Sequence, residues 1–211
     1  MNHRLSVICT LILFGVCLLF AVTPVRKTAN NNKTKTSKGD SRVHLLHADK
    51  LYYDNRIHQT AQFLVGNVKF DHEGTLMYCD SALFYEATNS FDAFGNVRMV
   101  QGDTLTLNSE VLYYNGIDRL ARARYDVVLK HLKSILYCDS LDYDRIYDLG
   151  YFFEGGRLLD QGNELTSDWG QYQPATHQAI FNYNVRLVNP EPPEPPKTVM
   201  VSDTLYYNTN T

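Results

Sequence analysis

A repeat of about 29 residues constrains this chain more than any other feature of its sequence. Self-similarity at a fixed period in this range is typical of stacked, repetitive folds. In five copies a leucine stands two positions before a tyrosine, and an acidic residue or serine stands two positions before the leucine. The marker tyrosines, which recur with this period, are Tyr53, Tyr85, Tyr114, Tyr143, Tyr172 and Tyr207.

A second element lies between each of the first five tyrosines and the next. It opens with Gly, Asn, Asp or Tyr and continues into alternating apolar residues. Turn-forming pairs such as Asn115-Gly116 separate the two elements, so each repeat supplies at least two strands. The copies of the second element are residues 66–70, 95–99, 125–129, 155–158 and 183–187.

The alternation of side chains predicts one apolar face and one charged face. Val97 and Met99 point one way, and Arg98 points the other. At about 3.3 Å per residue, a repeat can cross two facing sheets and return, placing one strand on each wall. The predicted interior residues are Leu51, Val68, Phe70, Leu83, Val97, Met99, Leu112, Val127, Leu129, Val185 and Leu187.

The sequence therefore predicts an all-β, solenoid-like β-jellyroll in which two antiparallel sheets face each other. The inward rows of both sheets would share one apolar interior. A groove that holds a ligand and a closed, dry core produce the same alternation, so both interpretations stay open. Because the chain stops soon after Tyr207, we expect an unpaired edge strand at that end of the sheet.

The first part of the chain has the pattern of a targeting segment. An uncharged apolar run from Leu5 to Val22 follows Arg4, and its length is compatible with a cleaved signal peptide or a membrane anchor. A polar linker and the repeat domain follow, and a Pro-rich loop that cannot donate ladder hydrogen bonds interrupts the last repeat. The expected divisions are 1–25 for the signal or anchor, 26–42 for the flexible linker, 43–211 for the repeat domain and 190–197 for the loop.

The charge of the repeat domain argues against nucleic acid as a partner. Of the 20 basic and 23 acidic residues, 7 and 1 precede Val43, which leaves 13 minus 22, or −9. Nucleic-acid surfaces need an excess of positive charge.

One basic row is nevertheless predicted on the outer face. It comprises Lys69, Arg98, Arg157 and Arg186, whose spacings match one, two and one periods of the repeat. This row is either a phosphate-binding ladder or a solvated face paired with carboxylates.

No motif for catalysis, a metal or a cofactor stands out. Asp139, Asp142 and Asp144 resemble a carboxylate cluster for glycoside hydrolysis, but turn formation explains them better. We expect the histidines His44, His47, His58 and His72 on loops or the surface rather than around a metal.

Two cysteines fall in matching strings of the domain. Cys79 and Cys138 lie two repeats apart, roughly 10 Å in the expected stack, which is too far for a disulfide. We expect both to act as small buried apolar residues.

The strings at residues 48–53, 91–99 and 101–105 resemble the "AD-x-L-x-Y", "A-x-G-N-V" and "GD-x-L" patterns of the OstA-like (organic solvent tolerance) family. That family includes the lipopolysaccharide-transport proteins LptA and LptC and the N-terminal domain of LptD. The resemblance implies a periplasmic β-jellyroll without enzymatic activity. It also implies a groove that shelters lipid A acyl chains and edge strands that join other OstA-like proteins, with an inner-membrane tether if the first segment is uncleaved.

Two other functions remain compatible with the residues. One is a structural or adhesive envelope module that binds no lipid, and the other is an enzyme acting on polysaccharides. No cofactor is expected in any of the three cases.

Overall fold

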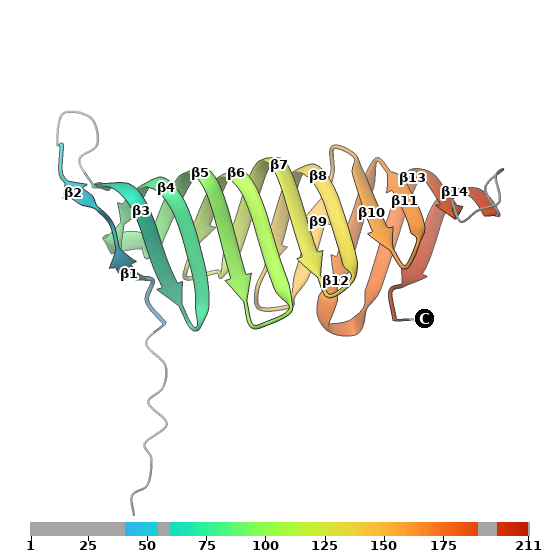
Figure 1. Ribbon diagram of the computed structural model, residues 1–211, viewed down its shortest axis with the longest axis horizontal. Coiled ribbons are helices and arrows are strands. Elements are labelled where there is room, and N and C mark those ends of the chain that lie inside the picture. The colour runs from blue at the N-terminus through green and yellow to red at the C-terminus, as the bar shows by residue number, and fades with distance from the viewer. Residues whose placement is uncertain (1–40, 55–59, 190–197, 211) are drawn as a thin grey trace, which may run out of the picture. The chain divides into compact units, whose positions relative to one another are not determined.

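The computed structural model describes residues 41–54, 60–189 and 198–210, so the predictions for residues 1–40, His58 and 190–197 lie outside the described residues. Two 3-10 turns, η1 (Glu86–Thr88) and η2 (Pro174–Thr176), interrupt an otherwise all-β chain (Figure 1). No helix in these three ranges is long and apolar enough to cross a membrane. The strands are β1 (His44–His47), β2 (Lys50–Tyr52), β3 (Gln62–His72), β4 (Thr75–Tyr85), β5 (Ser90–Gln101), β6 (Leu105–Asn115), β7 (Leu120–His131), β8 (Ser134–Asp144), β9 (Leu149–Phe152), β10 (Gly156–Asp160), β11 (Asn163–Ser167), β12 (Trp169–Gln173), β13 (Gln178–Asn189) and β14 (Thr198–Asn208).

All described strands belong to one antiparallel sheet, in which the long strands from β3 to β8 pair in sequence order. β9 and β10 together take the place of one long strand, because β8 pairs with both of them. β11 and β12 do the same beside β13. The predicted all-β, antiparallel jellyroll is confirmed.

The sheet folds over on itself because each long strand bends near its middle. The pairing register shifts there, as between Phe94 and Val97, and Gly95 and Asn96 have φ of 75° and 47°. Figure 1 shows the resulting two layers of strands. Wall 1 consists of β2, β9, β12, the first halves of β3, β5, β7 and β13, and the second halves of β4, β6, β8 and β14. Wall 2 consists of β1, β10, β11 and the other halves of the long strands.

Each long strand thus crosses both walls, whereas the sequence pattern predicted one strand on each wall per repeat. One repeat places two strand segments on each wall. Cys79 in β4 and Cys138 in β8 are therefore four strands apart, about 19 Å rather than about 10 Å. Both cysteines are free thiols.

The two sequence elements of the repeat meet at the bend. The Nδ2 atom of Asn96 donates a hydrogen bond to Oδ2 of Asp80 over 2.8 Å. Asn67 donates in the same way to Asp49 over 2.9 Å. Because Asn tolerates positive φ and carries an amide donor, it suits both the backbone and the side-chain requirement of this position. Asn184 donates to Asp168 in the same arrangement, over 2.6 Å.

The second copy of the repeat has a different register from the predicted one. Asp80, rather than Ser81, makes the bend contact, so the inward positions are Ala82 and Phe84. Leu83 and Tyr85 consequently lie on the outer face, and the prediction of Leu83 as an interior residue is wrong.

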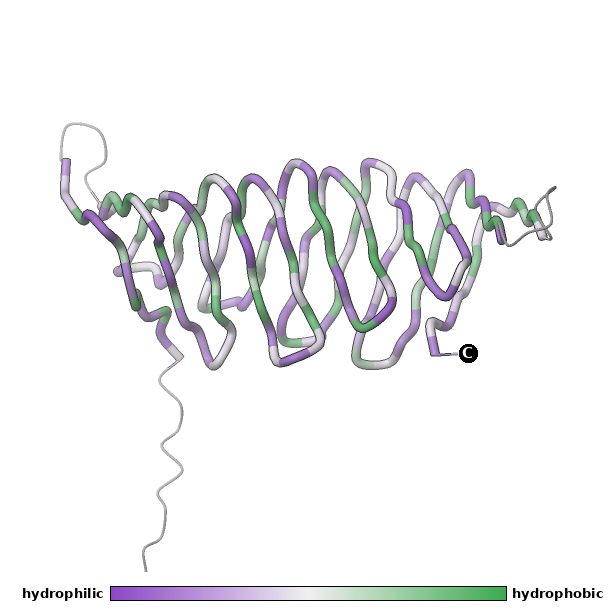
Figure 2. Tube along the Cα trace, viewed as in Figure 1, coloured by the Kyte–Doolittle hydropathy of each residue, from purple (hydrophilic) through white to green (hydrophobic). Residues whose placement is uncertain are grey.

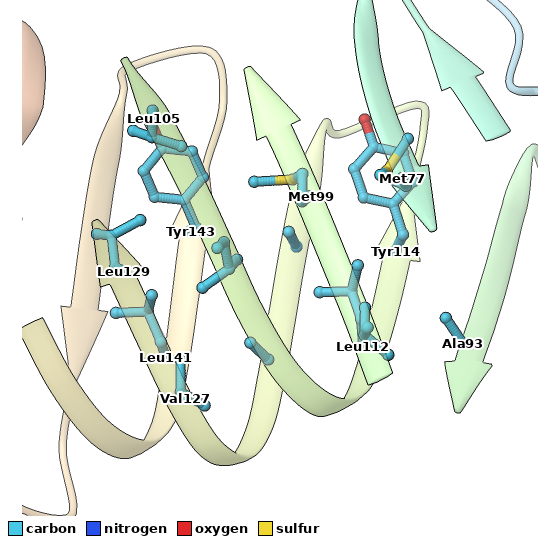
Figure 3. Packing of buried hydrophobic residues seen from close by; sticks show 14 of the residues in the cluster. Met77, Ala93, Met99, Leu105, Leu112, Tyr114, Val127, Leu129, Leu141 and Tyr143 are labelled. Atoms are coloured by element: carbon cyan, nitrogen blue, oxygen red, sulfur yellow. The ribbon is translucent and has the colours of Figure 1, made fainter. Parts of the chain in front are cut away.

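The core is the space between the two walls. Hydrophobic and hydrophilic residues alternate along the strands (Figure 2), and buried positions alternate with less buried ones in the same way. Figure 3 shows side chains of β5 to β8, including Met99, Leu112, Leu129 and Leu141, pointing into one common interior. The core of each repeat therefore continues into the next.

We predict that Gly95→Ala destabilises the protein more than Gly102→Ala. Both glycines have positive φ, but a Cβ at Gly95 would lie 2.7 Å from Oδ2 of Asp80, whereas a Cβ at Gly102 would meet no atom within 4 Å. Backbone strain should cost about 1 kcal/mol at either site, and loss of the bend hydrogen bond adds roughly 1 kcal/mol at Gly95. Urea denaturation of both variants measures the difference, and equal losses would contradict this role of the bend.

Candidate functional site

The candidate site consists of the apolar interior and the margin at which the two walls meet opposite the bend. Eight of the predicted interior residues are at most 3% exposed: Val68, Phe70, Val97, Met99, Leu112, Val127, Leu129 and Val185. Leu187 is half-buried and packs against this cluster. The interior is filled by these side chains and those of the other inward rows.

The interior is exposed at its two ends. Leu51 pairs with buried Leu64 and therefore faces inward, but it is 49% exposed at the β2 end. Met200 pairs with Leu187 and is 46% exposed in β14. Among the described strands β14 pairs with β13 alone, so one of its edges is open, as expected.

A row of polar pairs joins the walls opposite the bend. Each wall has an edge opposite the bend, where turns connect its strands, and we call this edge its lip. We call the row of polar pairs between the two lips the tyrosine seam. His72 Nδ1 lies 2.6 Å from the Tyr114 hydroxyl, and His131 Nδ1 lies 3.0 Å from the Tyr172 hydroxyl. In both pairs the histidine is on wall 2 and the tyrosine is on wall 1.

The other two repeats use different partners in the same places. The Tyr207 hydroxyl donates to Oδ2 of Asp160 over 3.0 Å. Gln101 reaches Tyr143 through Asp148, whose Oδ1 accepts from both over 2.7 and 3.0 Å. The seam therefore pairs His72, Gln101, His131 and Asp160 of wall 2 with Tyr114, Tyr143, Tyr172 and Tyr207 of wall 1.

This seam explains why the repeat carries a tyrosine. Tyr114, Tyr143 and Tyr172 are at most 2% exposed, so their rings belong to the core. A buried hydroxyl is costly unless it is hydrogen-bonded, and the polar residue of the opposite lip provides the partner. Phenylalanine would fill the same space but would leave the lips unjoined.

Arg145, in the turn between β8 and β9, reinforces the seam next to Tyr114. Its side chain donates to the Tyr114 hydroxyl on its own wall and across the lips to Thr75 Oγ1 and Gln101 Oε1. Two further donations, each over 3.2 Å, reach Nδ1 and the carbonyl oxygen of His72. Four of these five hydrogen bonds therefore cross from wall 1 to wall 2.

These contacts require His72 to be neutral. Its Nε2 lies 3.0 Å from the Ser41 carbonyl oxygen, which can only accept, and its Nδ1 accepts from Arg145. Burial lowers the pKa of His72, and the Arg145 charge lowers it further, against the raising effects of the Ser41 carbonyl and Glu73. Contrary to the sequence-based expectation of a loop or surface position, His72 is fully buried.

The seam is flanked by a hollow near its C-terminal end. This hollow, of about 490 Å³, opens between the two lips. Wall 2 contributes Leu132, Lys133, Ser134, Asp160 and Gln161, and wall 1 contributes His177, Thr209 and Asn210. Beside it, burial lowers the pKa of His131, and the nearby His177 adds to this effect.

The predicted basic row lies elsewhere. Lys69, Arg98, Arg157 and Arg186 all point outward from wall 2, close to the bend. Arg157 forms an ion pair with Glu164 over 2.9 Å, and the Lys69 ammonium lies 5.4 Å from the centre of the Tyr78 ring. The row faces away from the interior and from the lips.

Two of the three carboxylates in the predicted cluster have structural partners. Asp142 contacts Arg122 and Arg124, and Asp144 Oδ1 accepts from the backbone of its own turn. Within the described ranges no three His, Cys, Asp or Glu side chains are arranged to hold a metal ion. Burial raises the pKa of the Cys79 thiol to about 12, as expected for a cysteine that packs as a small apolar residue.

The tyrosine seam was not predicted from the sequence. A periodic signal for it exists, because the polar partners stand at positions 72, 101, 131 and 160, each one repeat period after the previous one. Their chemical types differ, so a search for identical residues does not align them.

Truncating a buried interior residue should cost far more stability than truncating an end residue. We predict a loss of about 2–5 kcal/mol for Leu112→Ala, which is fully buried. The matched variant Leu51→Ala should lose under about 1 kcal/mol, because that side chain is half exposed. Chemical denaturation of both variants tests this, and similar losses would mean that the interior does not end at β2.

Stability should fall as the pH drops from about 6.5 to 5.5. A histidine whose pKa is lowered by folding binds fewer protons in the folded state than in the unfolded state, so stability is complete above the unfolded value of 6.5 and decreases below it. Thermal melts at both pH values should show this loss. A His72→Gln, His131→Gln double variant should show a smaller loss, and His47→Gln, at an exposed site, should behave like the unmodified protein. An undiminished loss in the double variant would contradict the neutral seam.

Comparison with known proteins places the chain in a family. A family model described as OstA-like protein matches residues 40–192, whereas no curated protein matches. Among solved structures, the chain is similar to LptH, the LptA-homologous periplasmic component of the lipopolysaccharide transport device of Pseudomonas aeruginosa, with 8% identity, 76% of this chain and 93% of that chain covered, and a TM-score of 0.29. A TM-score this low supports no further argument. The family match, which spans well over half of the chain, shows that the protein belongs to the OstA-like family.

Proposed function

We propose that this protein is a non-enzymatic component of lipopolysaccharide transport and outer-membrane biogenesis that shelters lipid A acyl chains between its two walls. One observation supports the proposal most. A continuous apolar interior extends from Leu51 to Met200, and in the described part of the chain only hydrogen bonds with at least one side-chain partner join its lips. The lips can therefore part without breaking the backbone ladder.

The energies involved make this exchange feasible. Parting the lips breaks the four seam pairs and the four hydrogen bonds that Arg145 donates to wall 2, at about 1 kcal/mol per net hydrogen bond. Burying about 12 methylenes of one acyl chain gains roughly 10 kcal/mol. Lipid that enters through the lips would also cover the apolar side chains that the parting exposes.

The two ends of the sheet suit partners of the same fold. Open strand edges accept further strands through main-chain hydrogen bonds, and β14 has such an edge. Because Leu51 and Met200 expose apolar surface at the ends of the interior, another OstA-like protein added there would prolong the interior. Acyl chains could then pass between molecules without contacting water.

Location in the periplasm is part of the proposal. The apolar run at residues 1–25 would direct secretion, with the domain either released by cleavage or held at the inner membrane. The polar residues 26–42 would then act as a tether.

A structural or adhesive role without lipid is the second candidate. The observation that favours it is the dense filling of the interior, where residues such as Phe70, Met99 and Leu112 have no exposed surface. In this case the seam would hold the walls together permanently.

Photo-crosslinking separates the two candidates. A crosslinking residue at Met99 or Leu129 points into the interior, whereas one at Arg98 points outward from the same wall. We predict lipopolysaccharide adducts at the two interior positions and none at Arg98. Absence of adducts at every position would exclude the transport function, and adducts at Arg98 alone would indicate surface adhesion of the lipid.

A further inference from the structure

The geometry of the two walls determines where the headgroup of a sheltered lipid lies. The bend is closed by strands that continue from one wall to the other, so acyl chains can enter only through the lips or the ends. A lipid that enters through the lips keeps its polar headgroup there. Side chains at the lips, rather than those on the outer face, are then its neighbours.

The outer basic row lies away from such a headgroup, so the cations of the lips are its candidate partners: Arg119, Arg145 and Lys133, which lines the hollow. Lys133 carries a single ammonium group and lacks the planar fork of a guanidinium. Arg119 already forms an ion pair with Glu73. Arg145 is half-buried, and no carboxylate of the described residues lies within ion-pair distance of it. The acceptors of its side chain are all neutral: the Tyr114 hydroxyl, the Thr75 hydroxyl, the Gln101 amide oxygen and two atoms of His72.

Parting of the lips changes the surroundings of Arg145 selectively. Tyr114 lies on the same wall as Arg145 and remains its partner, while His72, Thr75 and Gln101 move away with wall 2. The guanidinium is then left with most of its N–H donors unpaired at the mouth of the interior. A planar fork of such donors fits a phosphate with two parallel charge-assisted hydrogen bonds, which are stronger than hydrogen bonds to neutral acceptors.

We propose that Arg145 is a binding site for a phosphate group of an anionic lipid headgroup, and that the phosphate replaces the neutral wall 2 acceptors when the lips open. This inference rests on the proposed function, because it requires acyl chains in the interior. It assigns two roles to one residue. Arg145 holds the lips closed without lipid and holds the headgroup when lipid is present.

Paired lipids test the proposal. The full-length protein is titrated with lipid A carrying both phosphates and with the same lipid A after enzymatic removal of the phosphates. We expect the unmodified protein to prefer the phosphorylated lipid at least about tenfold, which corresponds to about 1.4 kcal/mol. Arg145→Gln should lose this preference and keep its affinity for the dephosphorylated lipid. The matched variant Arg98→Gln, on the outer face, should keep the preference.

A second variant keeps the test decisive if Arg145→Gln fails to fold. Thr75→Val removes one wall 2 acceptor of Arg145 and preserves both the charge and the side-chain volume. It should increase the affinity for both lipids, because the closed lips lose one hydrogen bond, and it should leave the preference for the phosphorylated lipid in place. An unchanged affinity for both lipids in Thr75→Val, or an undiminished preference in Arg145→Gln, would overturn the headgroup site. Failure of the unmodified protein to bind either lipid would instead overturn the proposed function and the inference together.

Discussion

The hydroxyl groups of four repeat tyrosines, Tyr114, Tyr143, Tyr172 and Tyr207, connect the two walls, and the closed form of the domain depends on them. Each ring contributes apolar burial to the core, on the order of 1.5–3 kcal/mol. Each hydroxyl needs a partner, because a buried group without one costs about 1–3 kcal/mol. His72 and His131 meet Tyr114 and Tyr172 in this way. In the four repeats whose tyrosine points inward, a polar residue at the end of the wall 2 segment therefore accompanies it.

The two margins of the fold differ in strength. At the bend, the backbone itself runs from wall to wall, and contacts such as Asn96 with Asp80 fix its path. At the lips, side-chain contacts such as those of Arg145 join the walls. Parts of a protein held by few contacts open at lower free energy than its core strands. Under the proposed function, the lips are thus the margin at which this domain would admit a ligand without unfolding.

Much of the fold could be predicted from the sequence, because the repeat spacing and the alternation around Met99 and Leu129 require facing strands with one apolar side. The register of the second copy could not. Ala82, Leu83, Phe84 and Tyr85 offer apolar residues to both faces, and only the bend contact of Asp80 decides between them. The seam could not be predicted for a geometric reason. The tyrosines form hydrogen bonds with residues 41 to 47 positions away in the sequence, or reach their partner through Asp148. This offset depends on how the strands of one wall are displaced relative to those of the other.

The central claim is that the lips part when lipid enters. The distance between spin labels on opposite lips tests it most directly, with one label at Asp103 in the wall 2 turn after β5 and one at Tyr147 in the wall 1 turn after β8. The native cysteines are replaced beforehand. Addition of lipopolysaccharide should shift the distance distribution to longer values. An unchanged distribution, measured while lipopolysaccharide is bound, would contradict the account.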